Sequence, residues 1–178
     1  MSERPRVVVG IDGSAESRAA LQFALEDAAR RGQGVRSISV VTPPQYWPEA
    51  YGLAAPPTVG DVKRDLRRMA RRMLDDVLAD RPDLAAVPVE LHQLEGLPGR
   101  VLVEQSRDAD LLVVGHRGRG GLTSAVLGSV GLQCVLHARC PVAVVRLPAQ
   151  PRPEAENAAG RRDVARAEKG GPTLDPLS

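Results

Sequence analysis

At 178 residues the chain is long enough for one domain with a substantial buried core, and 43% of its residues are apolar. Its 24 Lys and Arg residues nearly balance 22 Asp and Glu residues, which argues against a protein that depends on attraction to nucleic acid or to a membrane surface. No apolar run approaches the roughly 20 residues of a membrane span, and no signal peptide is evident, so we expect a cytoplasmic protein.

Aromatic residues make up only 2% of the chain, so the core must be built from Val, Leu, Ile and Ala. Val-rich segments are typical of a parallel sheet that is covered on both faces. The two cysteines, Cys134 and Cys140, are too few for a disulfide framework, and we expect both to be structural.

The amino-terminal part of the chain predicts a strand, a helix and a second strand. Residues 6–11 are a Val-rich strand, and Ser14 is a candidate N-cap for the helix that follows. The apolar face of this helix recurs at helical spacing, at Ala20, Leu21, Ala24, Leu25 and Ala28. Gly32 ends the helix, and residues 35–41 form the second strand.

Residues 43–60 contain five prolines and all but one of the aromatic residues, which predicts an unusually long loop. Its rings either form a lid or partner surface, or pack on the edge of the domain. Residues 61–80 predict an amphipathic helix with a basic outer face. Aspartates interleave with its arginines and no aromatic residue accompanies them, so we expect a solvated face and no nucleic-acid partner.

The remaining segments continue the alternation of strands and helices. Residues 87–93 predict a third strand, and Pro88 places it at a sheet edge because proline lacks a backbone donor. Then come a helix over 97–108, a buried strand over 111–114, a helix through Leu136 and a last strand over 141–146. This alternation predicts a parallel, doubly wound sheet. From residue 148 onward, prolines and mixed charges predict a disordered tail.

A glycine-rich loop follows the buried strand at 111–114, with glycines at positions 115, 118, 120, 121 and 128. A strand, a glycine-rich loop and a helix in succession favour phosphate binding, because backbone N–H groups can converge where Cβ atoms are missing. The helix start adds unpaired N–H donors and the positive end of its dipole. The alternative is a glycine-rich turn without a ligand.

The spacing of this loop fits neither a Walker loop nor the dinucleotide fingerprint. It fits G-x2-G-x9-G-[ST], at Gly115, Gly118, Gly128 and Ser129. Together with the segment V-V-V-G-I-D-G-S at residues 7–14, this motif resembles the universal stress protein family in its ATP-binding branch, over roughly residues 5–147.

The resemblance implies a Rossmann-like α/β fold, with a five-stranded parallel doubly wound sheet in the strand order 3-2-1-4-5 and helices on both faces. It implies a universal stress protein domain at residues 1–147, followed by the disordered tail at 148–178. In that order strands one and four are neighbours. Their ends, at Asp12 and Gly115, would then meet at one crevice, where ligands bind in such sheets.

The resemblance also implies which residues contact ATP. Asp12 and Val40 would lie near the adenine, Val114 and Gly115 would face the ribose, and backbone N–H groups would hold the phosphates. The full expected set is Gly10, Ile11, Asp12, Val40, Val114, Gly115, Gly118, Arg119, Gly128, Ser129 and Val130. An Asp before Gly-Ser is also a good turn residue, so Asp12 has an alternative structural role. We expect any Mg²⁺ to be held chiefly by phosphate oxygens and water.

Three functions are open at this point. The first is a stress-response protein that binds ATP and signals by its occupancy. The second is a slow ATPase or a self-phosphorylating protein that uses Ser129 or Thr123, and the third is a cyclic AMP-binding protein. His116 is the only nearby candidate for a general base, and we assign no catalytic residue and no protein metal site.

The last strand is also a candidate interface. Family members commonly dimerise through it, and the segment Val142 to Val145 is apolar. An unpaired edge of this kind favours pairing with another chain. We therefore expect a homodimer.

Overall fold

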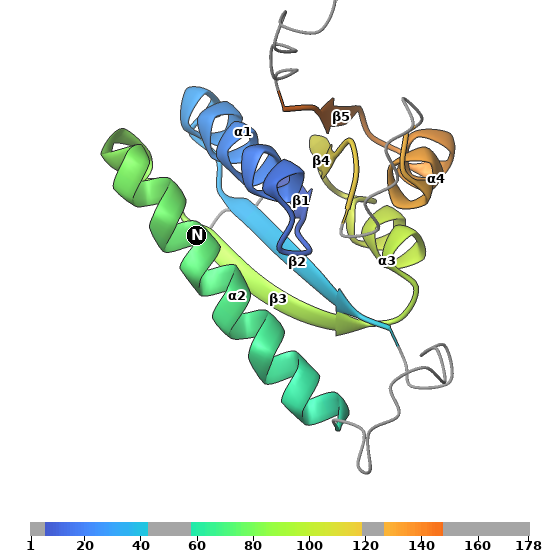
Figure 1. The fold of residues 1–178 in the computed structure, drawn as a ribbon. Coiled ribbons are helices and arrows are strands. Elements are labelled where there is room, and N and C mark those ends of the chain that lie inside the picture. The colour runs from blue at the N-terminus through green and yellow to red at the C-terminus, as the bar shows by residue number, and fades with distance from the viewer. Residues whose placement is uncertain (1–5, 43–57, 119–126, 148–178) are drawn as a thin grey trace, which may run out of the picture. The chain divides into compact units, whose positions relative to one another are not determined.

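Val-rich segments form a five-stranded parallel sheet, as predicted (Figure 1). The structure is a computed structural model and describes residues 6–42, 58–118 and 127–147. The strands are β1 (Val7–Gly10), β2 (Val35–Val41), β3 (Val89–Glu95), β4 (Leu111–Gly115) and β5 (Val142–Val145). Their order, β3-β2-β1-β4-β5, confirms the predicted doubly wound topology and puts β3 at an edge.

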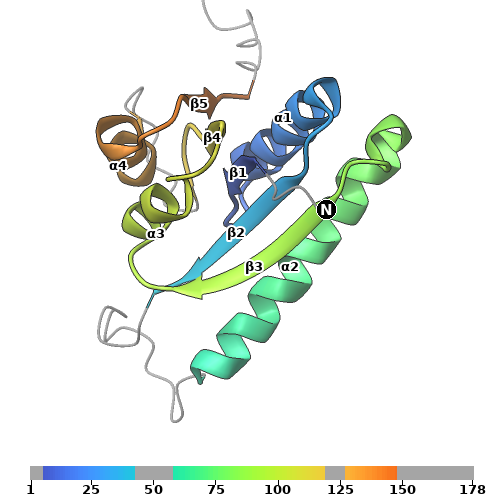
Figure 2. The ribbon, with the colours of Figure 1, turned by 180° about the vertical axis from the view of Figure 1, so that it is seen from behind.

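Helices cover both faces of the sheet, because successive strand residues point to opposite sides. They are α1 (Ala15–Arg31), α2 (Val59–Asp80), the short 3₁₀ helix η3 (Pro82–Leu84), α3 (Pro98–Gln105) and α4 (Ser129–His137). Helices α1 and α2 pack on the face that carries Val7 and Val9. Helices α3 and α4 pack on the face that carries Val8 and Leu112. Figure 2 shows these two helix pairs from behind.

Local signals in the sequence set both ends of α1. The Ser14 side chain accepts a hydrogen bond from the Ser17 backbone N–H at 3.1 Å, which confirms Ser14 as the N-cap. Gly32 adopts a φ of 66°, in the left-handed region that glycine occupies without strain, and forms the C-cap.

Helix α2 begins two residues earlier than predicted, because a capping box fixes its start. The Thr58 hydroxyl accepts from the Asp61 N–H, and the Asp61 carboxylate accepts from the Thr58 N–H. Hydrogen bonds from the Thr58 hydroxyl and N–H lower the pKa of Asp61. The predicted loop over 43–60 therefore ends sooner than expected. Its residues 43–57, and with them the choice between a lid and a packed edge, lie outside the described residues.

Two other boundaries shift for local reasons. The third strand begins at Val89 rather than at position 87, and the Pro88 carbonyl accepts from the Val35 N–H at 2.8 Å. Helix α3 ends at Gln105 rather than near position 108, where Ser106 forms the C-cap and donates its hydroxyl to a backbone carbonyl.

Both cysteines are free thiols that pack in the core between the sheet and the α3–α4 pair. Cys134 is fully buried, and burial raises the pKa of its thiol to about 11. Cys140 is partly buried just before β5. These positions agree with the structural role expected for the two residues.

Two predictions concern the whole chain: the absence of a membrane span and the disordered tail. None of the helices in the described ranges is both long and apolar enough to cross a membrane. The tail predicted at 148–178 lies outside the described residues, so its disorder and the division of the chain at residue 147 stay predictions.

Candidate functional site

A cavity of about 600 Å³ opens at the carboxyl ends of β1 and β4, which pair side by side. The winding of the chain reverses between these two strands. The volume of the cavity lies in the usual range for small-molecule sites, about 300–1,000 Å³. The residues expected at a nucleotide that line this cavity are Gly10, Ile11, Asp12, Val40, Val114, Gly115, Gly118, Gly128, Ser129 and Val130. Arg119 lies outside the described residues. The two predicted turns are thus brought together, and their contact with a ligand stays a prediction.

Asp12 takes part in the turn after β1 and also lines the cavity. Its Oδ1 atom accepts hydrogen bonds from the Ser14 backbone N–H (3.0 Å) and from the Ser14 hydroxyl (2.7 Å). Its Oδ2 atom faces Gly118 so closely that a Cβ at position 118 would collide with it. The two roles considered for Asp12, turn residue and cavity residue, are therefore compatible.

Two glycines let helices approach the strand ends that form the cavity. A Cβ on Gly115 would lie 3.0 Å from the carbonyl carbon of Glu16, so the first turn of α1 packs directly on the end of β4. A Cβ on Gly10 would lie 2.7 Å from a methyl carbon of Leu102, so α3 packs directly on β1. Gly10 and Gly115 therefore shape the walls in addition to any contact with a ligand.

Helix α4 begins in the wall of the cavity. Gly128 is its N-cap, and no side chain in the described part of the chain caps this end. The Gly128 N–H donates to the His116 carbonyl at 3.1 Å, which differs from the expectation that this amide would hold phosphate. The amides of the first helical turn are instead those of Ser129, Val130 and Gly131, which have no partner inside the helix.

Part of the cavity wall is apolar and was largely missed from the sequence. The apolar lining residues beyond the predicted set include Ile38, Leu66, Pro98, Leu102 and Leu127. Ile38 precedes Val40 by two residues on the same strand face, so the alternation of β2 contained a signal for it. Leu66 and Leu102 belong to helices α2 and α3, whose approach to the cavity depends on tertiary packing.

His116 follows β4 and contacts Arg146, which follows β5. Its Nε2 atom lies 2.7 Å from a guanidinium nitrogen of Arg146, and its backbone N–H donates to the Val145 carbonyl at 2.7 Å. Burial is the largest effect that lowers the pKa of His116, and the nearby Arg146 and Arg117 lower it further. Glu16 raises this pKa and so opposes them. Because arginine has no acceptor, the neutral imidazole accepts this bond at Nε2. That nitrogen is engaged, which weakens the case for His116 as a general base.

The sequence profile of the universal stress protein family matches residues 3–146. The chain belongs to the universal stress protein family. A universal stress protein of Mycobacterium tuberculosis is 34% identical over 140 residues, a match that covers 79% of this chain and 47% of the relative. A universal stress protein of Mycobacterium bovis is 34% identical over 145 residues, with coverage of 78% and 47%. The chain thus spans about half the length of the curated relatives it matches.

Solved structures of universal stress proteins share this fold. A universal stress protein in complex with cAMP is 26% identical, with a TM-score of 0.58, over 80% of this chain and 96% of that chain. A universal stress protein from Lactobacillus plantarum is 22% identical, with a TM-score of 0.58, over 80% of this chain and 97% of that chain. The second likeness shows the fold alone. In this universal stress protein domain, the cavity lies where the parallel sheet changes its direction of winding.

Proposed function

We propose that this universal stress protein domain is a cytoplasmic nucleotide-binding module whose ligand is ATP, and that occupancy by ATP carries a stress signal to a partner. The observation that carries the proposal is the cavity itself. It joins Asp12 at the end of β1 to Gly118, Gly128 and Ser129 around the start of α4, although these turns are far apart in the sequence.

The start of α4 supports a phosphate at one side of this cavity. Ser129, Val130 and Gly131 supply first-turn amides, and the helix dipole adds positive potential there. No side chain among the described residues caps these donors, so an anion would complete the helix end. The residues that shape the approach are glycines, which leave the backbone accessible.

The apolar lining supports a planar base in the part of the cavity formed by β2 and α3. Ile38 and Val40 come from β2, and Pro98 and Leu102 come from α3. Apolar walls with few polar groups are typical of sites that bury an aromatic ring. Within the described ranges, no cluster of three or more His, Cys, Asp or Glu residues could hold a metal ion. Mg²⁺ would therefore accompany the phosphates of the ligand.

The most direct test of the function identifies the nucleotide that the purified full-length chain retains. Mass spectrometry of the released ligand, followed by titration of ATP, ADP, AMP and cyclic AMP into the stripped protein, ranks the candidates. We expect ATP to be retained and to bind most tightly. A stripped protein that binds none of these nucleotides would remove the proposal.

Cyclic AMP is the second candidate ligand. It is favoured by one observation, the likeness to a universal stress protein in complex with cAMP at 26% identity. Against it stands the positive potential expected at the start of α4, because a cyclic monophosphate carries one negative charge and a triphosphate carries several. The same titration separates the two, since cyclic AMP would then outcompete ATP.

Binding without rapid turnover is the form of the function that the site favours. His116 is engaged at Nε2 by Arg146, and the exposed Ser129 has no neighbouring base among the hydrogen bonds of the described residues. Ser129 is the described candidate for self-phosphorylation, whereas Thr123 lies outside the described residues. We propose that hydrolysis, measured as phosphate release, is slow compared with exchange of the bound nucleotide.

We further propose that the chain forms a homodimer through β5. This strand is at the edge of the sheet and pairs only with β4 among the described strands. The neighbouring helix α4 exposes Leu132, Val135 and Leu136 to between 47% and 65%. An open strand edge beside an exposed apolar helix face favours burial against a second copy.

A further inference from the structure

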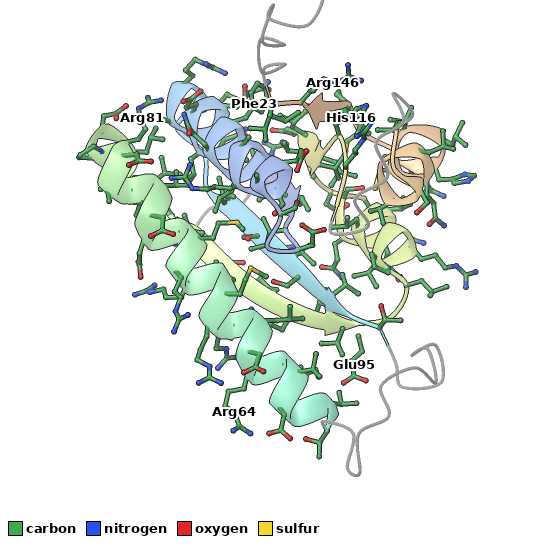
Figure 3. The ribbon with its side chains drawn as sticks, in the orientation of Figure 1. Phe23, Arg64, Arg81, Glu95, His116 and Arg146 are labelled. Atoms are coloured by element: carbon green, nitrogen blue, oxygen red, sulfur yellow. The ribbon has the colours of Figure 1, made fainter. Side chains whose placement is uncertain are left out.

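His116 and Arg117 line the cavity that α4 also borders, and Arg146 contacts His116. The register of β4 and β5 pairs Gly115 with Val145, so the next residues, His116 and Arg146, emerge side by side. Figure 3 shows their side chains close together, and the guanidinium lies 2.7 Å from His116 Nε2. Arg117 is the next residue along the chain and lines the cavity. The carboxyl edge of the sheet therefore carries two arginines around one imidazole.

Within the described residues, nine arginines form an ion pair with a carboxylate, but Arg117 and Arg146 do not. Arg18, Arg64 and Arg81 each form an ion pair with a carboxylate. For Arg117 and Arg146, no ion pair is found within the described part of the chain. The imidazole of His116 occupies one donor of Arg146, and a guanidinium has five N–H donors in a fixed fork. Arg146 is thus oriented, and no carboxylate in the described ranges neutralises its charge.

The same imidazole connects this charge to the start of α4. Its backbone N–H is bonded to the end of β5, and its backbone carbonyl accepts from the Gly128 N–H at the N-cap. The side chain of His116 holds Arg146, and the main chain of His116 holds the helix start. Glu16 of α1 raises the pKa of His116, whereas the two arginines lower it. A ligand anion at the helix start would therefore lie beside the two positive charges.

We propose that Arg146, oriented by His116, acts with Arg117 to recognise the second and third phosphates of a nucleoside polyphosphate. This inference rests on the proposed function and names the ligand class of the same site. A guanidinium forms charge-assisted hydrogen bonds with phosphate oxygens, and their strength grows with the negative charge of the ligand. Arg146 and Arg117 then determine specificity for polyphosphates, whereas His116 is a positioning residue.

The test compares ligands that share adenosine and differ in charge. Calorimetry measures adenosine, AMP and ATP binding to the full chain and to Arg146→Met, with Arg139→Met as the matched control. Arg139 is exposed on the turn before β5, at the opposite end of that strand. We expect Arg146→Met to weaken ATP binding about tenfold, which is the effect of losing hydrogen bonds to a charged group. The affinity for adenosine should stay unchanged. The control keeps the affinities of the unchanged chain.

A second pair of variants tests the positioning role of His116. His116→Leu removes the acceptor for Arg146, and His116→Gln keeps an acceptor oxygen on a side chain of similar reach. We expect His116→Leu to lower the ratio of ATP to adenosine affinity and His116→Gln to restore most of it. A loss that affects adenosine and ATP equally would show a general structural effect and would overturn the proposal.

The outcomes also separate this inference from the proposed function. If Arg146→Met binds ATP as tightly as the unchanged chain does, recognition by Arg146 is wrong while nucleotide binding stands. If the unchanged chain prefers cyclic AMP to ATP, polyphosphate recognition is wrong and nucleotide binding still stands. If it binds neither adenosine nor ATP, the proposed function fails, and the inference fails with it.

Discussion

At the scale of single residues, several side chains in this domain combine a structural contact with a place at the cavity. Asp12 closes the turn after β1 through Ser14 and also lies against Gly118, another residue that lines the cavity. His116 joins the ends of β4 and β5 and the start of α4 through its main chain, while its ring holds Arg146. Substitutions at such residues must therefore be designed to separate fold stability from ligand binding.

His116 makes the stability of the domain depend on pH in a defined direction. Its folded-state pKa lies below its ordinary value of 6.5, so between these values the folded protein binds fewer protons than the unfolded chain. The stability linked to this group is fully present above pH 6.5 and is lost as the pH falls through the folded-state pKa. We expect urea unfolding to show a larger loss of stability from pH 7.5 to pH 5.5 in the unchanged protein than in His116→Gln.

The carboxylates contribute equally to the loss of stability in both proteins, because both proteins contain them. The remaining histidines, His92 and His137, are also common to both. Equal losses of stability in the unchanged protein and in His116→Gln would contradict the placement of His116 beside Arg146 and Arg117.

At the scale of elements, the two amino-terminal helix caps offer a matched comparison. Ser14 caps α1 and donates to Asp12 in the cavity wall, whereas Thr58 caps α2 away from that wall. We expect Ser14→Ala and Thr58→Ala each to lower the free energy of unfolding by about 1 kcal/mol, measured by urea denaturation. Only Ser14→Ala should also lower the affinity for ATP, by about fivefold, because one hydrogen bond that orients Asp12 is lost.

This pair tests whether Asp12 acts in binding or only in the turn. If both alanine variants keep the ATP affinity of the unchanged protein, then Asp12 needs no orientation by Ser14 and its ligand role is doubtful. If Thr58→Ala weakens ATP as much as Ser14→Ala, then the loss reflects general stability.

The edge strand β5 carries a further prediction at the same scale. The carbonyl of Pro141 accepts from Leu112 of β4, and that of Val145 accepts from His116 just after β4. The backbone groups of the alternate residues, Val142 and Val144, therefore face the open edge. Val144→Pro removes one outward donor, and proline is tolerated at an edge. We expect this variant to be monomeric by light scattering, while the unchanged chain is dimeric. A monomeric unchanged chain, or a dimeric Val144→Pro, would contradict the β5 interface.

At the scale of the whole molecule, the fold was largely predictable because its signals are local and repeated. Alternating Val-rich and amphipathic segments predict a parallel sheet with helices on both faces, and Ser14 and Gly32 predict the ends of α1. The strand order came from the resemblance to a family rather than from periodicity. Once that order is given, the meeting of Asp12 with the glycine-rich loop follows from parallel topology.

The details of the cavity were less predictable because they depend on distant packing. The bond from the Gly128 N–H to the His116 carbonyl joins residues on either side of the loop, and no local pattern indicates it. The contact between His116 and Arg146 depends on the register of β4 with β5, and register is set by the packing of both strands. Leu66 and Leu102 reach the cavity only through the placement of their helices.

The central claim is that backbone amides at the start of α4 hold the phosphates of ATP, and Gly128 is the position that tests it most directly. A Cβ at Gly128 would lie at an ordinary contact distance, 3.5 Å, from the nearest described protein atom, and the backbone there is extended, so a side chain with a Cβ is compatible with the backbone. Gly60→Val, in the exposed first turn of α2, is the matched control. Calorimetry with ATP should give clear binding for the unchanged chain and for Gly60→Val. It should give no detectable binding for Gly128→Val, with an unchanged midpoint of thermal unfolding. Equal ATP affinities for Gly128→Val and the unchanged chain would contradict the account.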